Sequence, residues 1–145
     1  MSNSILAIDP GPAKSAWIEF AHDQPWQFGI HDNETMLDEI IPMYRESQLA
    51  IEMVGHYGKG MPAGKEVFDT CVWIGRFIQH WKRSTDRKHI ILLRKTVCAH
   101  VCGSAKAKDG NIRQSMLDRF GPQWTKKAQR TFGARWPWQS RRRTP

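Results

Sequence analysis

The N-terminal part of the chain alternates between short apolar runs and turn-forming residues. Aliphatic and aromatic side chains gather at residues 5–8, 15–20 and 25–30, with glycine, proline and charged residues between them. Short apolar runs bounded by such residues are typical of β-strands. Because the connections are brief, we expect three consecutive strands paired antiparallel.

The spacing of the apolar positions changes to a helical period after these strands. Residues 33–44 place Met36, Ile40 and Tyr44 on one side of a predicted helix. Asn33 stands at its start as an N-cap, and Pro42 should shorten or kink it.

Two further apolar runs, at residues 49–54 and 89–93, predict a fourth and a fifth strand. The helical segment 33–44 separates the fourth strand from the earlier ones, so the fourth strand is expected to lie parallel to the first. Four glycines and a proline make residues 55–64 a loop, and residues 96–108 are expected to form a connection with one short helical turn.

The longest helical pattern covers residues 65–82. One apolar stripe runs along it, formed by Val67, Cys71, Ile74, Ile78 and Trp81, and it is widened by Phe68, Val72 and Phe77. A stripe of this width predicts burial in the core or against a partner chain.

A last helix is predicted over residues 109–120. Asp109 is its expected N-cap and Gly121 follows its end. The apolar residues expected to face inward are Ile112, Met116, Leu117 and Phe120.

The resulting order of elements is three strands, helix, strand, helix, strand, helix. This order predicts an α/β domain over residues 1–121, with a mixed five-stranded sheet flanked by helices, as in the ribonuclease H-like fold. Residues 122–145 are expected to form a basic, Arg- and Trp-rich tail, either ordered or disordered.

Charge is distributed unevenly along the 145 residues. The formal net charge is +8, which favours a polyanionic partner such as nucleic acid. Seven of the 22 basic residues and none of the 14 acids lie in residues 122–145. The charge therefore argues for a basic tail more than for a basic face on the domain.

Three cysteines are a sparse and odd set, and they favour a reducing compartment. No apolar run is long enough for a membrane span, and no signal-peptide pattern opens the chain. We therefore expect a cytoplasmic protein that does not enter a membrane.

Two predicted strands each carry one carboxylate, Asp9 and Glu52. An acid in a buried strand costs several kcal/mol unless something compensates its charge. If the two strands are neighbours, a divalent cation held between the acids would offset both desolvation and repulsion. The alternative is that either acid sits at a strand end and accepts hydrogen bonds from backbone amides.

Four motifs together resemble the RuvC-like Holliday-junction resolvases, especially short phage or prophage members. They are the aliphatic-Asp-Pro-Gly opening at 5–11, Leu-Ala-Ile-Glu at 49–52, Gly-Lys-Gly at 58–60, and Lys-Asp-Gly-Asn-Ile-Arg at 108–113. The resemblance covers residues 5–121. It implies a metal-dependent endonuclease acting on branched DNA, with two Mg²⁺ or Mn²⁺ ions, four carboxylate-type ligands and often a homodimer.

Under this resemblance Asp9 would bridge the two ions and Glu52 would bind one. The chain departs from the family downstream, because the expected final helix with its last acids is absent and an acid-free Arg/Trp-rich segment takes its place. Asp109 and Asp118 are the remaining candidate ligands, although an N-cap role and an exposed surface position explain them equally simply. A protein that binds DNA or junctions without cutting them is the alternative function.

Several basic and aromatic residues are candidates for nucleic-acid contacts. The basic candidates, which solvated surface charge would also explain, are Lys59, Lys65, Lys106, Lys108 and Arg113. His56 and Tyr57 follow the Glu52 strand and are candidates for stacking on a base, or for packing on the domain.

Three weaker patterns favour other functions less strongly. Cys98, His100 and Cys102 have ligand-like spacing for zinc, but no second pair accompanies them, which favours buried small side chains. The tail tryptophans could stack on single strands or be disordered. An actin-like ATPase fragment is disfavoured, because 145 residues cannot supply a second lobe.

Overall fold

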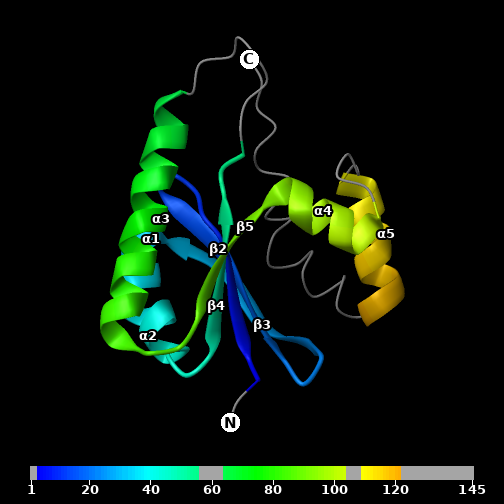
Figure 1. Ribbon diagram of the computed structural model, residues 1–145, viewed down its shortest axis with the longest axis horizontal. Coiled ribbons are helices and arrows are strands. Elements are labelled where there is room, and N and C mark those ends of the chain that lie inside the picture. The colour runs from blue at the N-terminus through cyan, green and yellow to red at the C-terminus, as the bar shows by residue number, and fades with distance from the viewer. Residues whose placement is uncertain (1–2, 56–63, 104–108, 122–145) are drawn as a thin grey trace. The chain divides into compact units, whose positions relative to one another are not determined.

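The computed structural model describes residues 3–55, 64–103 and 109–121. The chain divides into two compact units, one ending at Leu93 and one beginning at Arg94. Within the described part of the first unit, five strands form one sheet in the order β3-β2-β1-β4-β5 (Figure 1). The strands are β1 (Ile5–Asp9), β2 (Lys14–Ala21), β3 (Gln24–Asp32), β4 (Gln48–Met53) and β5 (His89–Leu93).

The sheet is mixed in direction. β1 pairs antiparallel with β2 and parallel with β4, while β2 and β3 pair antiparallel and β4 and β5 pair parallel. This confirms the predicted α/β architecture of three antiparallel strands followed by parallel ones. The parallel pairing of β1 with β4 brings the two acid-bearing strands side by side.

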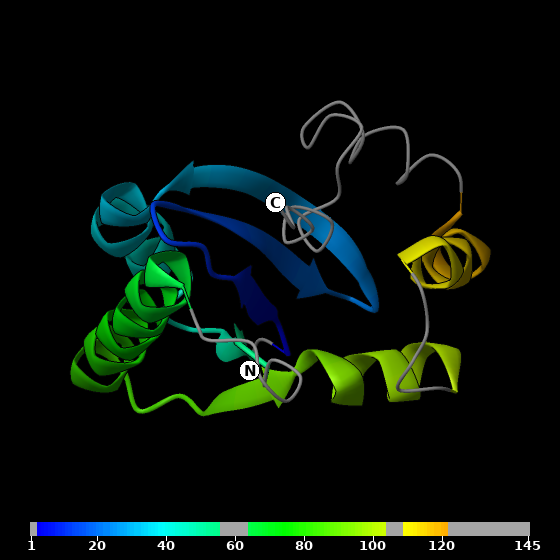
Figure 2. The same cartoon turned by 90° about the horizontal axis from the view of Figure 1, so that it is seen from above.

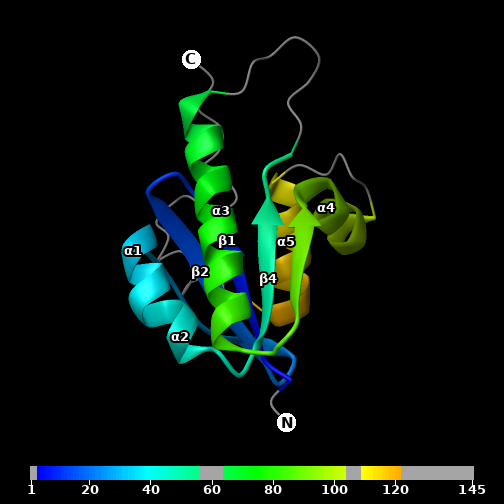
Figure 3. The same ribbon diagram turned by 60° about the vertical axis from the view of Figure 1, so that its left-hand side comes forward.

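The core lies between one face of the sheet and the helices of residues 33–43 and 65–84. Figures 2 and 3 show these helices on the same side of the sheet. Leu6, Ile8 and Ile51 project from the strands into this core, each at most 2% exposed. Trp81 and Phe77 meet them from the long helix and are fully buried. Burying apolar side chains of this size is the main stabilising term of the fold.

The first helical segment is continuous but changes its winding. It consists of α1 (Asn33–Thr35), the π-helix η1 (Met36–Ile40) and α2 (Ile41–Met43). The N–H of Ile41 donates to the carbonyl of Met36, five residues back. Pro42 has no N–H to give to the ladder, and the widened turn immediately before it is the irregularity expected there.

Asn33 is not the N-cap that the sequence suggests. It is the first residue of α1, and the N-cap position belongs to Asp32, whose side chain makes no capping hydrogen bond. Asn33 is 1% exposed because its side chain bonds to residues of an earlier turn.

The buried face of the long helix α3 (Lys65–Ser84) is narrower than the sequence predicts. Ile74, Phe77 and Trp81 are buried, as expected. Phe68 and Val72 are instead 62% and 60% exposed. They lie on the solvent side of the helix, where the sheet cannot reach them.

The second unit contains α4 (Arg94–Cys102) and α5 (Asp109–Phe120) among its described residues. The short turn predicted between strand and last helix is wrong, because α4 begins directly after β5 and is nine residues long. α5 begins at Asp109 itself, which is therefore not its N-cap. Gly121 ends α5 as predicted, with φ of +83° and its N–H on the carbonyl of Leu117.

Among the described residues, no helix combines the length and apolarity needed to cross a bilayer.

Candidate metal centre

Asp9 and Glu52 occupy matching positions on the two central parallel strands. The register pairs Ile8 of β1 with Ile51 of β4, and each acid is the next residue along its strand. Neighbouring strands lie about 4.8 Å apart, and side chains alternate between the two faces of a sheet. Since Ile8 and Ile51 face the core, Asp9 and Glu52 project together from the opposite face.

The surroundings of the two acids are partly apolar. Asp9 lies opposite Ala16 of β2, and Glu52 lies opposite Leu92 of β5. Both acids are half-buried. Two carboxylates placed this close repel each other. A divalent cation between them offsets that repulsion.

The turn that follows Asp9 is fixed by a partly buried ring of hydrogen bonds. The N–H of Gly11 donates to Ser15 Oγ at 3.3 Å, Ser15 Oγ donates to Asn33 Oδ1 at 2.6 Å, and Asn33 Nδ2 donates to the carbonyl of Gly11 at 2.9 Å. The N–H of Asn33 also donates to the carbonyl of Ala13 at 2.9 Å. The ring fixes the backbone conformation at Gly11, two residues beyond Asp9.

Sequence reasoning missed this ring. Ser15 stands two residues before Trp17, so alternation places it on the core face of β2, where it is 1% exposed. A hydroxyl in a core needs a hydrogen-bond partner, and that requirement was the available signal. Glycine is needed at position 11 because a Cβ there would lie 2.2 Å from the carbonyl oxygen of Lys14.

The donor set fits a hard cation that keeps part of its own ligand shell. Among the described residues, no group of three or more His, Cys, Asp or Glu side chains could hold a metal ion. Mg²⁺ is commonly bound through one or two carboxylates, with water and substrate phosphates completing its shell. Asp9 and Glu52 meet that requirement, and their strands hold them rigidly.

The other two candidate acids belong to the second unit. Asp118 is exposed on α5, where Gln114 Nε2 donates to its Oδ1 at 2.8 Å. Asp109 begins α5, and its side chain lies outside the described part of the structure. Their role as metal ligands stays a prediction.

Lys65 is the one basic candidate whose side chain is described. It is exposed at the start of α3, and its Nζ lies 2.5 Å from Asp69 Oδ2. The hydrogen bond that Lys65 donates to Asp69, followed by the carboxylate's charge, raises the pKa of Lys65 above its ordinary value. Lys65 thus keeps its charge, although it is already engaged by an acid.

The remaining candidates lie outside the described residues or side chains. His56, Tyr57, Lys59, Lys106, Lys108 and the tail after Gly121 belong to undescribed segments. The structure also does not describe the side chains of Arg113, Cys98 and Cys102. His100 is exposed on α4. The predictions for these residues therefore stand untested.

Comparison with solved structures shows that the fold is RuvC-like. The chain is similar to the structure of Thermus thermophilus RuvC, with a TM-score of 0.64 and 12% identity over 81% of this chain and 80% of that one. It is also similar to T. thermophilus RuvC in complex with Holliday junction substrate, with a TM-score of 0.64 and 11% identity over 83% and 81% of the two chains. No protein-family model and no curated protein matches the sequence.

Proposed function

We propose that this protein is a metal-dependent endonuclease that cleaves phosphodiesters in branched DNA, in the manner of a Holliday-junction resolvase. The observation that carries the proposal is the side-by-side position of Asp9 and Glu52 on one face of β1 and β4. The RuvC fold supports it, since a relative with this fold has been solved with a Holliday junction substrate.

The two acids would hold Mg²⁺ or Mn²⁺ at the carboxyl ends of the central strands. A bound divalent ion makes a water nucleophilic near neutral pH and stabilises the leaving oxygen. The chain's contribution is placement: β1 and β4 fix the two carboxylates, and the Gly11–Ser15–Asn33 ring fixes the turn after Asp9.

A second copy of the chain belongs to the proposal. Resolving a four-way junction requires cuts in two strands, and one acid pair per chain supplies one cut. A homodimer would bring two acid pairs to one junction. Sedimentation of the full chain with and without junction DNA measures this directly.

The test is nicking of a labelled four-way junction in Mg²⁺ or Mn²⁺ by the full chain, compared with Asp9→Asn and Glu52→Gln. Each variant should lower the rate about 100-fold or more, because losing a ligand removes several kcal/mol of charge stabilisation in the transition state. Asp38→Asn is the matched control, since Asp38 is exposed on η1, which covers the face of the sheet opposite to the two acids. Equal rates in all four proteins would overturn the assignment of Asp9 and Glu52.

A second candidate function is binding of junction DNA without cleavage. The observation that favours it is the lack of a third metal-ligating side chain beside the acid pair among the described residues. Tight binding of the junction with no nick in either metal would establish this function and exclude the nuclease.

A further inference from the structure

Lys14 lies on the same face of the sheet as Asp9 and Glu52. It is the first residue of β2 and precedes Ser15, which is buried on the core face. Because side chains alternate between the two faces of a strand, Lys14 projects from the opposite face, where the acid pair lies. In the sequences of the five described strands, Lys14 is the only lysine or arginine.

Lys14 is one strand away from Asp9 and two residues further along the sheet. The register pairs Asp9 of β1 with Ala16 of β2, and Lys14 stands two positions before Ala16. Side chains in such a diagonal relation lie about 7–8 Å apart, which is within reach of a long side chain. The residues that adjoin both are Ala16 and Gly11, whose side chains are a methyl group and a hydrogen. Neither has a side chain long enough to separate Lys14 from the acids.

The backbone at Lys14 is held by the turn between β1 and β2. A Cβ on Gly11 would lie 2.2 Å from the carbonyl oxygen of Lys14, so these two backbone segments are closely packed. Ala13, the preceding residue, accepts the N–H of Asn33 at 2.9 Å. Ser15, the following residue, is 1% exposed. The Lys14 side chain therefore starts from a fixed point beside the acid pair.

The acid opposite Lys14 does not take up its N–H donors. Lys14 Nζ lies 3.8 Å from Asp32 Oδ1 of β3, and both side chains are 68% exposed. This distance suits an ion pair but is too long for a hydrogen bond, so Asp32 leaves the three N–H donors of the ammonium to other acceptors. An exposed pair of this kind contributes little to stability. The stability of the fold therefore does not explain a lysine at this position.

A polyanion that approaches this face meets three acids. Asp9 and Glu52 repel a phosphate until a divalent ion compensates their charge, and Asp32 lies opposite Lys14 in the register of β2 and β3. Lys14 is the cation that the strands themselves provide, and its ion pair offsets the charge of Asp32. An ammonium is a compact charge with three rotatable donors, which suits the oxygens of a single phosphate.

We propose that Lys14 binds a phosphate of the DNA strand that is cut, beside the acid pair. The inference rests on the proposed function, because that function supplies both the DNA and the metal. A phosphate contact fixes the position of a strand without reading its sequence. Lys14 thus holds the strand against the face that carries Asp9 and Glu52, and it acts in binding rather than on the bond that breaks.

The first test measures the affinity of the full chain for a four-way junction in EDTA at several salt concentrations. Lys14→Gln should reduce the slope of log K against log salt by about 0.9, the contribution of one phosphate contact. Lys14→Arg keeps the charge and should keep the slope. Lys88→Gln is the matched control, because Lys88 is exposed and precedes the amino end of β5, whereas the acids lie at the carboxyl ends of their strands. It should leave the slope unchanged.

The second test compares the same variants in nicking of the junction with Mg²⁺. Lys14→Gln should raise the KM for the junction about 3-fold to 10-fold and leave kcat within about 2-fold. The reason is that a contact made equally in the bound substrate and in the transition state changes binding alone.

Asp32→Asn separates binding of DNA from shielding of Asp32. If Lys14 served only to shield Asp32, Lys14→Gln would have no effect on the slope in a chain that also carries Asp32→Asn. Under the proposal the slope falls by about 0.9 in both backgrounds, because the phosphate contact does not depend on Asp32.

An effect that disappears in the Asp32→Asn background would overturn the proposal, and so would equal slopes for Lys14→Gln and Lys88→Gln. Both results leave the proposed nuclease intact. A fall in kcat with an unchanged KM would also overturn the proposal, since Lys14 would then act on the reaction and not on binding. A wild-type chain that neither binds nor nicks the junction would instead overturn the proposed function.

Discussion

Asn33 holds Gly11 from 22 positions away along the chain, with Asn33 Nδ2 on the Gly11 carbonyl at 2.9 Å. Ser15 closes the same contact from the other side, because its Oγ accepts from Gly11 and donates to Asn33. The Asp-Pro-Gly turn is thus stabilised by side chains from the start of β2 and from the first turn of α1.

Asn33→Ala should destabilise the fold by about 1–3 kcal/mol, because it leaves the partly buried Gly11 carbonyl without a donor and the buried Ser15 hydroxyl without an acceptor. Ser15→Ala should cost a similar amount, and the double variant should cost less than the two together. Urea unfolding measures all three. Lys14→Ala is the control, since the Lys14–Asp32 pair is 68% exposed on both sides and its loss should change stability by less than about 1 kcal/mol. Additive losses would show that the ring does not act as a unit.

Two glycine substitutions should change the stability of the fold in opposite directions. Gly11→Ala should cost about 1–3 kcal/mol, because its Cβ would lie 2.2 Å from the Lys14 carbonyl oxygen. Gly75→Ala should stabilise by about 0.5–1 kcal/mol, since position 75 lies inside α3 and a Cβ there meets nothing within 4 Å. Thermal midpoints of the two variants test this pair, and midpoints shifted the same way would contradict it.

Divalent metal should stabilise the protein only when both acids are present. Mg²⁺ or Mn²⁺ should raise the thermal midpoint of the wild type by binding the folded state at Asp9 and Glu52. The rise should vanish in Asp9→Asn and persist in Asp38→Asn. A rise of the same size in Asp9→Asn would place the metal elsewhere.

Stability should fall above pH 10, in part through Tyr44. Burial, and to a smaller extent the charge of Glu19, raise the pKa of the Tyr44 phenol above its ordinary 10.0. Above pH 10 the unfolded chain releases this proton while the folded chain retains it, so the free energy of unfolding falls as the pH rises. Tyr44→Phe should lose about 0.5–1.5 kcal/mol at pH 8, because the hydroxyl donates to Gln27 Oε1 at 3.0 Å. Its further decline above pH 10 should be shallower than that of the wild type, as urea midpoints at pH 8, 10 and 11 would show.

The sheet could be predicted from sequence because its signal is local. Each strand is a short apolar run between turn residues, and the predicted bounds lie within two residues of the observed ones. The adjacency of Asp9 and Glu52 followed from the parallel pairing that a helical crossover requires. The capping rule was wrong for Asn33, because the partner that decides its role lies 22 residues away.

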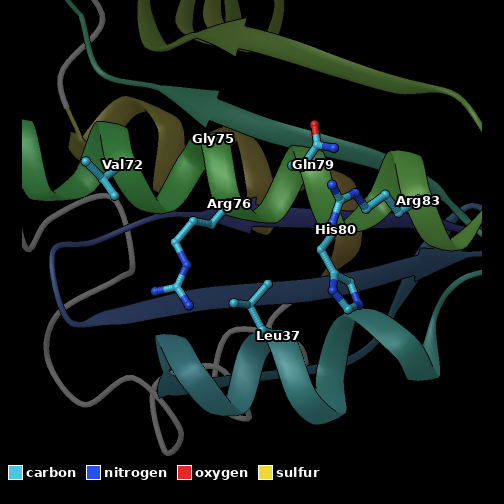
Figure 4. Close-up of a pocket in the computed structure, with 7 residues that line it drawn as sticks. All are labelled: Leu37, Val72, Gly75, Arg76, Gln79, His80 and Arg83. Carbon is cyan, nitrogen blue, oxygen red and sulfur yellow. The ribbon is translucent and has the colours of Figure 1, made fainter.

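Burial on α3 was predictable only in part. Helical spacing identifies which residues share a side, but it does not say how far the sheet extends around the helix. Phe77 and Phe68 therefore looked equivalent in the sequence, whereas one is fully buried and the other is 62% exposed. The groove between α3 and η1 (Figure 4) was not predictable at all, since it requires Leu37 of η1 to lie beside residues of α3.

The central position of β1 in the sheet determines which unfolding event separates Asp9 from Glu52. β1 is bonded to β2 on one side and β4 on the other, and its Leu6 and Ile8 are at most 2% exposed. Backbone amides in such a strand exchange with solvent mainly through global opening, whereas helix ends and turns open locally. The geometry of Asp9 and Glu52 should therefore survive partial unfolding elsewhere and disappear only with the cooperative unfolding of the sheet.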